Sequence, residues 1–106
     1  DWHVTFYNEK VEDETLFFLY GILANLLHII EMMLQFGPAL GKPYTESLGE
    51  GLFDFLAKGK EGINRSLFCT LKGNEIIILH SFIKKTKKTP KKELKLARKR
   101  MREVKS

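Results

Sequence analysis

The chain has 106 residues, which is enough for one small domain with a modest hydrophobic core. Hydrophobic residues make up 43% of it and charged residues 29%, a balance that excludes global disorder. Its single cysteine excludes an internal disulfide and a cysteine-paired zinc site, and it indicates a reducing compartment such as the cytoplasm.

The formal net charge of +5 conceals a steep separation of charge along the chain. Residues 1–54 carry 2 basic and 9 acidic residues, a net charge of −7, whereas residues 55–106 carry 16 basic and 4 acidic residues, a net charge of +12. Residues 84–106 alone have a net charge of +10. A surface this positive attracts polyanions, so the candidate partners are nucleic acid and anionic membrane, with simple solubility as the alternative.

The first strand is predicted over residues 2–7, where apolar residues alternate with others: Trp2, Val4 and Phe6. Residues 8–15 are polar and acidic and lead into a helix over residues 16–36, for which Asp13 is the expected N-cap. No basic segment followed by an apolar run opens the chain, so no signal peptide is expected.

The predicted helix over residues 16–36 is apolar enough to be compared with a transmembrane span, which needs about 20 apolar residues. Its polar or small residues recur every three or four positions and share one stripe: Gly21, Asn25, His28, Glu31 and Gln35. Such groups are energetically costly inside a bilayer, so the segment is predicted to be a core helix with one solvent-exposed stripe and not a membrane span. Gly21 weakens the helix interior, so one broken helix or a helical pair is expected.

Three further strands are predicted by their apolar, β-branched composition, over residues 52–57, 65–71 and 75–81. Gly73 and Asn74 suit a tight turn between the last two, because both tolerate positive φ. A final helix begins after residue 88, with Thr89 as its expected cap and one apolar stripe: Leu94, Ala97, Met101 and Val104.

This order of elements is strand, two helices or one broken helix, three strands and a C-terminal helix. It predicts an α+β fold in which an antiparallel sheet packs against helices. Residues 1–106 are expected to form a single domain, and Cys69 is expected to be a small core residue.

The densest basic cluster follows the last predicted strand and reads His80-Ser81-Phe82-Ile83-Lys84-Lys85-Thr86-Lys87-Lys88-Thr89-Pro90. Cations spaced this way can contact successive phosphates, with a solvated linker as the alternative. Together with Gly51-Leu52-Phe53-Asp54-Phe55-Leu56 and Gly62-Ile63-Asn64-Arg65, this motif resembles the HigB-like branch of the RelE/ParE superfamily, which contains the toxins of type II toxin–antitoxin modules. The resemblance covers most of the chain, but only the basic motif is specific for the branch.

The resemblance implies a RelE/ParE-like fold and a cytoplasmic, ribosome-dependent mRNA endonuclease, an mRNA interferase that arrests growth. It also implies neutralisation by a helix-turn-helix antitoxin, and a toxin–antitoxin hetero-oligomer on operator DNA. Such cleavage uses the RNA 2′-hydroxyl as nucleophile, so it needs a proton acceptor, a proton donor and cations that stabilise the phosphorane, but no metal or cofactor.

The candidate catalytic residues are Arg65, His80, Lys84 and Lys85. Arg65 suits phosphate binding, with a salt bridge to Asp54 as the alternative. His80 exchanges protons near neutral pH, with a buried structural histidine as the alternative. Lys84 and Lys85 are expected to clamp phosphate or donate a proton. Further RNA contacts are expected from Lys58, Lys60, Lys87, Lys88, Lys91 and Lys92, with ordinary solvation as the alternative for the first two.

Two positions depart from the pattern of the family. Ala57 is interpreted as standing where relatives carry the arginine of a Glu-Leu-Arg strand, which predicts weakened activity, and Glu46 stands where relatives often carry a basic residue. The three histidines, His3, His28 and His80, have no metal-ligand spacing, so no metal site is expected. A ParE-like, gyrase-directed toxin without nuclease activity and a non-catalytic RNA-binding module remain the alternative functions.

Overall fold

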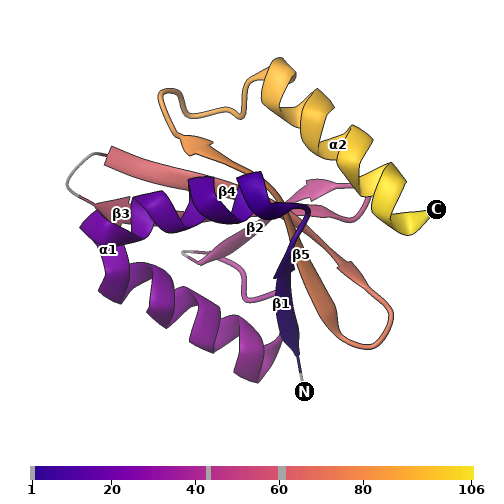
Figure 1. Ribbon diagram of the computed structural model, residues 1–106, viewed down its shortest axis with the longest axis horizontal. Helices are drawn as coiled ribbons and strands as arrows, with labels where there is room; N and C mark the ends of the chain where they lie inside the picture. The colour runs from indigo at the N-terminus through magenta and orange to yellow at the C-terminus, as the bar shows by residue number, and fades with distance from the viewer. Residues whose placement is uncertain (1, 43, 60–61) are drawn as a thin grey trace.

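The fold is taken from a computed structural model that describes residues 2–42, 44–59 and 62–106, with the backbone alone for residues 17–27. The described elements follow in the order β1 (His3–Phe6), α1 (Glu9–Phe36), β2 (Thr45–Gly49), β3 (Leu52–Gly59), β4 (Gly62–Leu71), β5 (Glu75–Ile83) and α2 (Lys91–Lys105). The described strands form one sheet in the order β1-β5-β4-β3-β2, with α1 on one face and α2 on the other (Figure 1). This arrangement confirms the predicted α+β class.

The sheet is mixed, so the prediction of an antiparallel sheet is wrong at one edge. β1 pairs with β5 in parallel, with Val4 opposite Ile76, whereas the other pairs are antiparallel. A parallel neighbour requires a long connection, and here everything from α1 to β4 lies between the two strands. β2 was not predicted, because its residues Thr45–Gly49 include a single leucine and gain their strand structure from pairing with β3.

α1 is one helix of 28 residues, and Figure 1 shows that it bends sharply within its length. It begins earlier than expected because the Asn8 side chain caps it, accepting a hydrogen bond from the Val11 backbone N–H at 2.8 Å. The expected cap, Asp13, lies inside the helix. Glu9 and Glu12 lie in the first turn, where negative charge favours the positive end of the helix dipole.

The polar stripe of α1 is exposed where its side chains are described, at His28, Glu31 and Gln35, as the sequence predicted. The side chains at positions 21 and 25 lie outside the described residues. No helix in the described part of the chain is long and apolar enough to cross a membrane.

Two hydrophobic layers hold the sheet between the helices. The layer under α1 is built by buried residues of the helix and of alternate strand positions: Val11, Ile29, Met33, Phe55, Ala57, Phe68, Ile76 and Ile78. The layer under α2 contains the predicted helix stripe, with Ala97 and Met101 buried and Leu94 and Val104 packed beside them. Cys69 is buried in the same layer, as expected for a small core residue.

Candidate functional site

Arg65 is held inside the protein by contacts on several sides of its guanidinium group. Its Nε lies 3.4 Å from Asp54 Oδ2, while Nη1 donates a hydrogen bond to Thr89 Oγ1 at 2.8 Å and Nη2 donates one to the Lys87 carbonyl at 3.0 Å. Arg65 is only 5% exposed. The salt bridge to Asp54, one of the two alternatives from the sequence, is therefore present, and Arg65 ties the linker after β5 to the sheet.

The Arg65 contact also explains why Thr89 does not cap α2. The structure places Pro90 at the N-cap position without a side-chain hydrogen bond, and the Thr89 hydroxyl accepts from Arg65 instead. The start of α2 is thus held by the hydrogen bond from Arg65 of the sheet to Thr89, and not by a side-chain cap within the helix.

His80 is buried against α2, with its Nε2 3.2 Å from Glu93 Oε1 and its ring stacked on Phe82. A β-bulge places it there, since Leu67 is opposite His80 but Phe68 is opposite Ile78. The extra residue shifts the alternation of β5, as bulges do. The predicted pair Arg65 and His80 therefore shares the α2-facing side of the sheet, but both side chains are covered.

The remaining predicted cations lie outside this buried cluster. Lys84 is half-buried, and its backbone N–H donates to the Ile63 carbonyl at 2.7 Å. The exposed lysines of the linker and of the outer side of α2 are here called the lysine surface: Lys85, Lys87, Lys88, Lys91, Lys92, Lys95 and Lys99. Lys58 is exposed on β3, and Lys60 lies outside the described residues.

Two arginines of α2 point inward and hold the helix against the sheet. Arg100 Nη1 donates to the Leu79 carbonyl at 2.7 Å, and its guanidinium lies 4.7 Å from the centre of the Tyr7 ring. Arg98 Nη2 donates to the Leu48 carbonyl at 3.1 Å. Because these two arginines are used for packing, the outer positive surface of α2 is formed mainly by lysines, together with the exposed Arg102.

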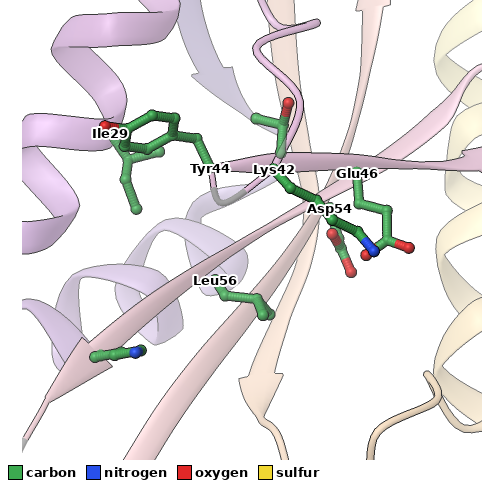
Figure 2. A pocket seen from close by; sticks show the side chains of 8 residues that line it. Ile29, Lys42, Tyr44, Glu46, Asp54 and Leu56 are labelled. Carbon is green, nitrogen blue, oxygen red and sulfur yellow. The ribbon is translucent and has the colours of Figure 1, made fainter.

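A pocket of about 500 Å³ opens where β2 and β3 meet the loop that precedes β2. Figure 2 shows Tyr44 and Ile29 on one side of it and the carboxyl groups of Asp54 and Glu46 on the other. The lining also includes Lys42, Thr45, Leu56 and Lys58, whereas Arg65 and His80 are not part of it. This pocket was not predicted, because it depends on β2, which carries Glu46 and has no strand signal of its own.

Asp54 and Glu46 are direct cross-strand partners. Two negative charges in that position destabilise the sheet, which suggests that the pair has a function. The pair would also have indicated the pocket from the sequence if β2 had been predicted. Burial raises the pKa of Asp54 from 3.8 to about 6, while the positive charges of Arg65 and Lys84 lower it and Glu46 raises it further. Asp54 therefore changes its charge close to neutral pH. No three His, Cys, Asp or Glu side chains of the described residues gather as a metal site.

Comparison with known protein families identifies the chain. Residues 20–102 match the family model described as phage-derived protein Gp49-like (DUF891), which spans more than three quarters of the sequence. The chain belongs to this family. Gp49-like proteins are RelE/ParE-like toxins, which confirms the superfamily seen in the basic motif. No curated protein matches the chain.

The position of Ala57 in this Gp49-like protein speaks against the expectation that it replaces a functional arginine. Ala57 is fully buried in the layer under α1, so an arginine there would have to bury its charge in an apolar core. Leu56 lies on the opposite face, directly opposite Arg65, and lines the pocket.

Proposed function

We propose that this Gp49-like protein is the toxin of a type II toxin–antitoxin module, of the HigB-like branch, and that it cleaves mRNA on the ribosome. The observation that carries the proposal is the separation of three inward arginines, Arg65, Arg98 and Arg100, from an outward lysine surface. Exposed, closely spaced lysines attract a phosphate backbone at little structural cost, because none of them is needed to hold the fold.

In this proposal Lys84 and Lys85 contact the phosphate at the cleavage point and stabilise the phosphorane charge. Arg65 is a positioning residue, since it fixes the linker through Thr89 and the Lys87 carbonyl. His80 is the proposed proton-transfer group. Its Nε2 faces Glu93, so contact with RNA requires α2 to move away from the sheet.

The test is primer extension on an mRNA translated in the presence of the purified protein. New 5′ ends are expected with the native protein, and far fewer with a Lys84→Ala/Lys85→Ala variant. Lys72→Ala is the matched control, because Lys72 is an exposed lysine in the turn at the other end of the β4–β5 pair. Absence of new ends with native protein that is folded and bound to ribosomes contradicts the proposal.

A second candidate function is RNA binding without cleavage, and the burial of Arg65 and His80 favours it. The primer-extension assay, combined with a measurement of RNA binding, distinguishes the two functions. Binding without cleavage predicts salt-sensitive retention on ribosomes or RNA with no new 5′ ends, and it predicts that Lys84 and Lys85 affect affinity alone.

We further propose a neutralising antitoxin partner with a helix-turn-helix domain, and assembly of the pair on operator DNA. The family membership supports an antitoxin. Growth arrest on expression of this chain, relieved by co-expression of the neighbouring open reading frame, is the expected result. Continued arrest with every neighbouring reading frame contradicts this pairing.

A further inference from the structure

The pocket between β2 and β3 plays no part in the proposed backbone contacts, yet it has the features of a binding site. Tyr44, Ile29 and Leu56 give it apolar walls. The Tyr44 ring is held edge-on against the His28 ring, with the centroids 5.9 Å apart and the planes at 66°. A pocket of this size with an aromatic wall and a few polar groups suits a planar heterocycle.

Asp54 is the most buried carboxylate among the polar residues that line the pocket. It is only 4% exposed, and it is a lining residue (Figure 2). Arg65 Nε lies 3.4 Å from Asp54 Oδ2 but is not aligned for a hydrogen bond, so the two groups pair by charge alone. Among the described residues no hydrogen bond to the Asp54 carboxylate is present, so its oxygens can accept hydrogen bonds from a ligand in the pocket.

A carboxylate accepts hydrogen bonds and donates none, which selects among the RNA bases. Guanine presents two neighbouring donors on its Watson–Crick edge, N1–H and the 2-amino group. Adenine and cytosine present one donor group beside a ring-nitrogen acceptor, and uracil presents one N–H between two carbonyl oxygens. Only guanine matches both oxygens of a carboxylate at once.

We propose that this pocket binds a guanine base of the RNA, with the Asp54 carboxylate accepting hydrogen bonds from N1–H and the 2-amino group and with Tyr44 packing against the ring. The proposal rests on the proposed function in taking RNA as the ligand. Lys42 and Lys58 also line the pocket, so the sugar–phosphate of the same nucleotide meets positive charge there. The site lies on β2 and β3, apart from the lysine surface that contacts the backbone.

The test is equilibrium binding of nucleoside monophosphates to the full chain at pH 7.5 by calorimetry. Guanosine monophosphate is expected to bind roughly tenfold more tightly than inosine monophosphate, which lacks only the 2-amino group, and more tightly than adenosine monophosphate. Asp54→Asn is expected to abolish the preference, because its amide places a donor against a donor. Glu50→Gln is the matched control, since Glu50 is an exposed carboxylate of the β2–β3 turn.

Tyr44→Leu is expected to weaken binding of all the nucleotides while keeping the preference for guanosine over inosine. Thermal unfolding verifies that each variant is folded. Equal affinities for guanosine and inosine monophosphate, or an unchanged preference in folded Asp54→Asn, would overturn the proposal. Tighter binding of arginine amide than of guanosine monophosphate would overturn it too, because the pocket would then receive a protein side chain.

Failure of this proposal is distinguishable from failure of the proposed function. Cleavage of mRNA at sites without enrichment of guanine contradicts the guanine pocket and leaves the nuclease intact. Selective binding of guanosine monophosphate by a protein that cleaves no mRNA supports the pocket and contradicts the nuclease.

Discussion

The guanidinium of Arg65 in the middle of the sheet donates a hydrogen bond to the hydroxyl of Thr89, the residue directly before the N-cap of α2. The same group faces Asp54 and the Lys87 carbonyl, so a single side chain joins β3, β4 and the linker. The path of the basic linker is therefore set by a buried ion pair in the sheet beneath it.

Arg65→Ala is predicted to lower the free energy of unfolding by about 3–5 kcal/mol, because it leaves Asp54 buried without its positive partner. Adding Asp54→Asn to this variant is predicted to restore part of the loss, since the remaining group is then neutral. Urea unfolding of the native protein, the two single variants and the double variant measures the coupling. Additive effects would show that Arg65 and Asp54 act independently.

Asp54 is predicted to make stability depend on pH between about 4 and 6. Its pKa is raised to about 6 in the folded protein, so in this window the folded chain holds a proton that the unfolded chain has released. The stabilisation that the Asp54 proton gives to the folded protein is therefore complete below pH 4 and is lost as the pH rises through 6. A pKa difference of about two units limits this change in the free energy of unfolding to about 3 kcal/mol.

Comparison with Asp54→Asn isolates this contribution, because the other titrating groups are common to both proteins. The native protein is expected to lose stability relative to the variant between pH 4 and pH 7, measured by urea unfolding at each pH. Parallel pH profiles of the two proteins would contradict a raised pKa.

Ala57→Arg and Leu56→Arg are predicted to differ sharply although the positions are adjacent. The first buries a guanidinium in the apolar layer under α1 and is expected to cost several kcal/mol or to prevent folding. The second places it at the pocket, on a half-buried position opposite Arg65, and is expected to leave the fold intact. Circular dichroism and thermal unfolding compare the two variants. Similar melting temperatures would contradict the assignment of positions 56 and 57 to opposite faces of the sheet.

If the lysine surface binds RNA, its loss must change the salt dependence of binding. Each contact with a phosphate of single-stranded RNA contributes about 0.7 to the slope of log affinity against log salt concentration. Replacing Lys87, Lys88 and Lys91 with alanine is expected to reduce the slope by about 2, measured by fluorescence anisotropy with a short RNA. Lys10→Ala/Lys72→Ala/Lys105→Ala is the control for net charge, because it removes the same number of exposed lysines elsewhere. An equal change of slope in that control would mean that net charge, and no defined surface, determines the salt dependence.

Much of the fold was predictable because its signals are local. The apolar, β-branched composition of β3, β4 and β5 and the apolar stripe of α2 each depend on neighbouring residues, and the predicted elements agree closely with the structure. β2 was not predictable in the same way, because residues Thr45–Gly49 become a strand only by pairing with β3. The parallel pairing of β1 was hidden for the same reason.

The candidate site was predictable in its residue types but not in their surroundings. The sequence named Arg65 and His80 as candidates and offered burial of each as the alternative, but it could not choose between exposure and the contacts with Asp54 and Glu93 that the structure shows. The bulge that directs His80 toward α2 has no sequence signal in β5, where apolar residues run without interruption from Ile76 to Leu79. The role given to Ala57 stays a prediction. Its burial under α1, where an arginine would be costly, was not readable from the sequence, because a step of one residue along a strand exchanges the two faces.

The parallel pairing of β1 with β5 has a consequence during synthesis. Val4 can meet its neighbour Ile76 only after β5 has been synthesised, so β1 waits for its partner while α1 and three further strands are made. The linker and α2, which carry the lysine surface, follow β5 along the chain. The lysine surface is therefore added to a sheet whose strands have all been made.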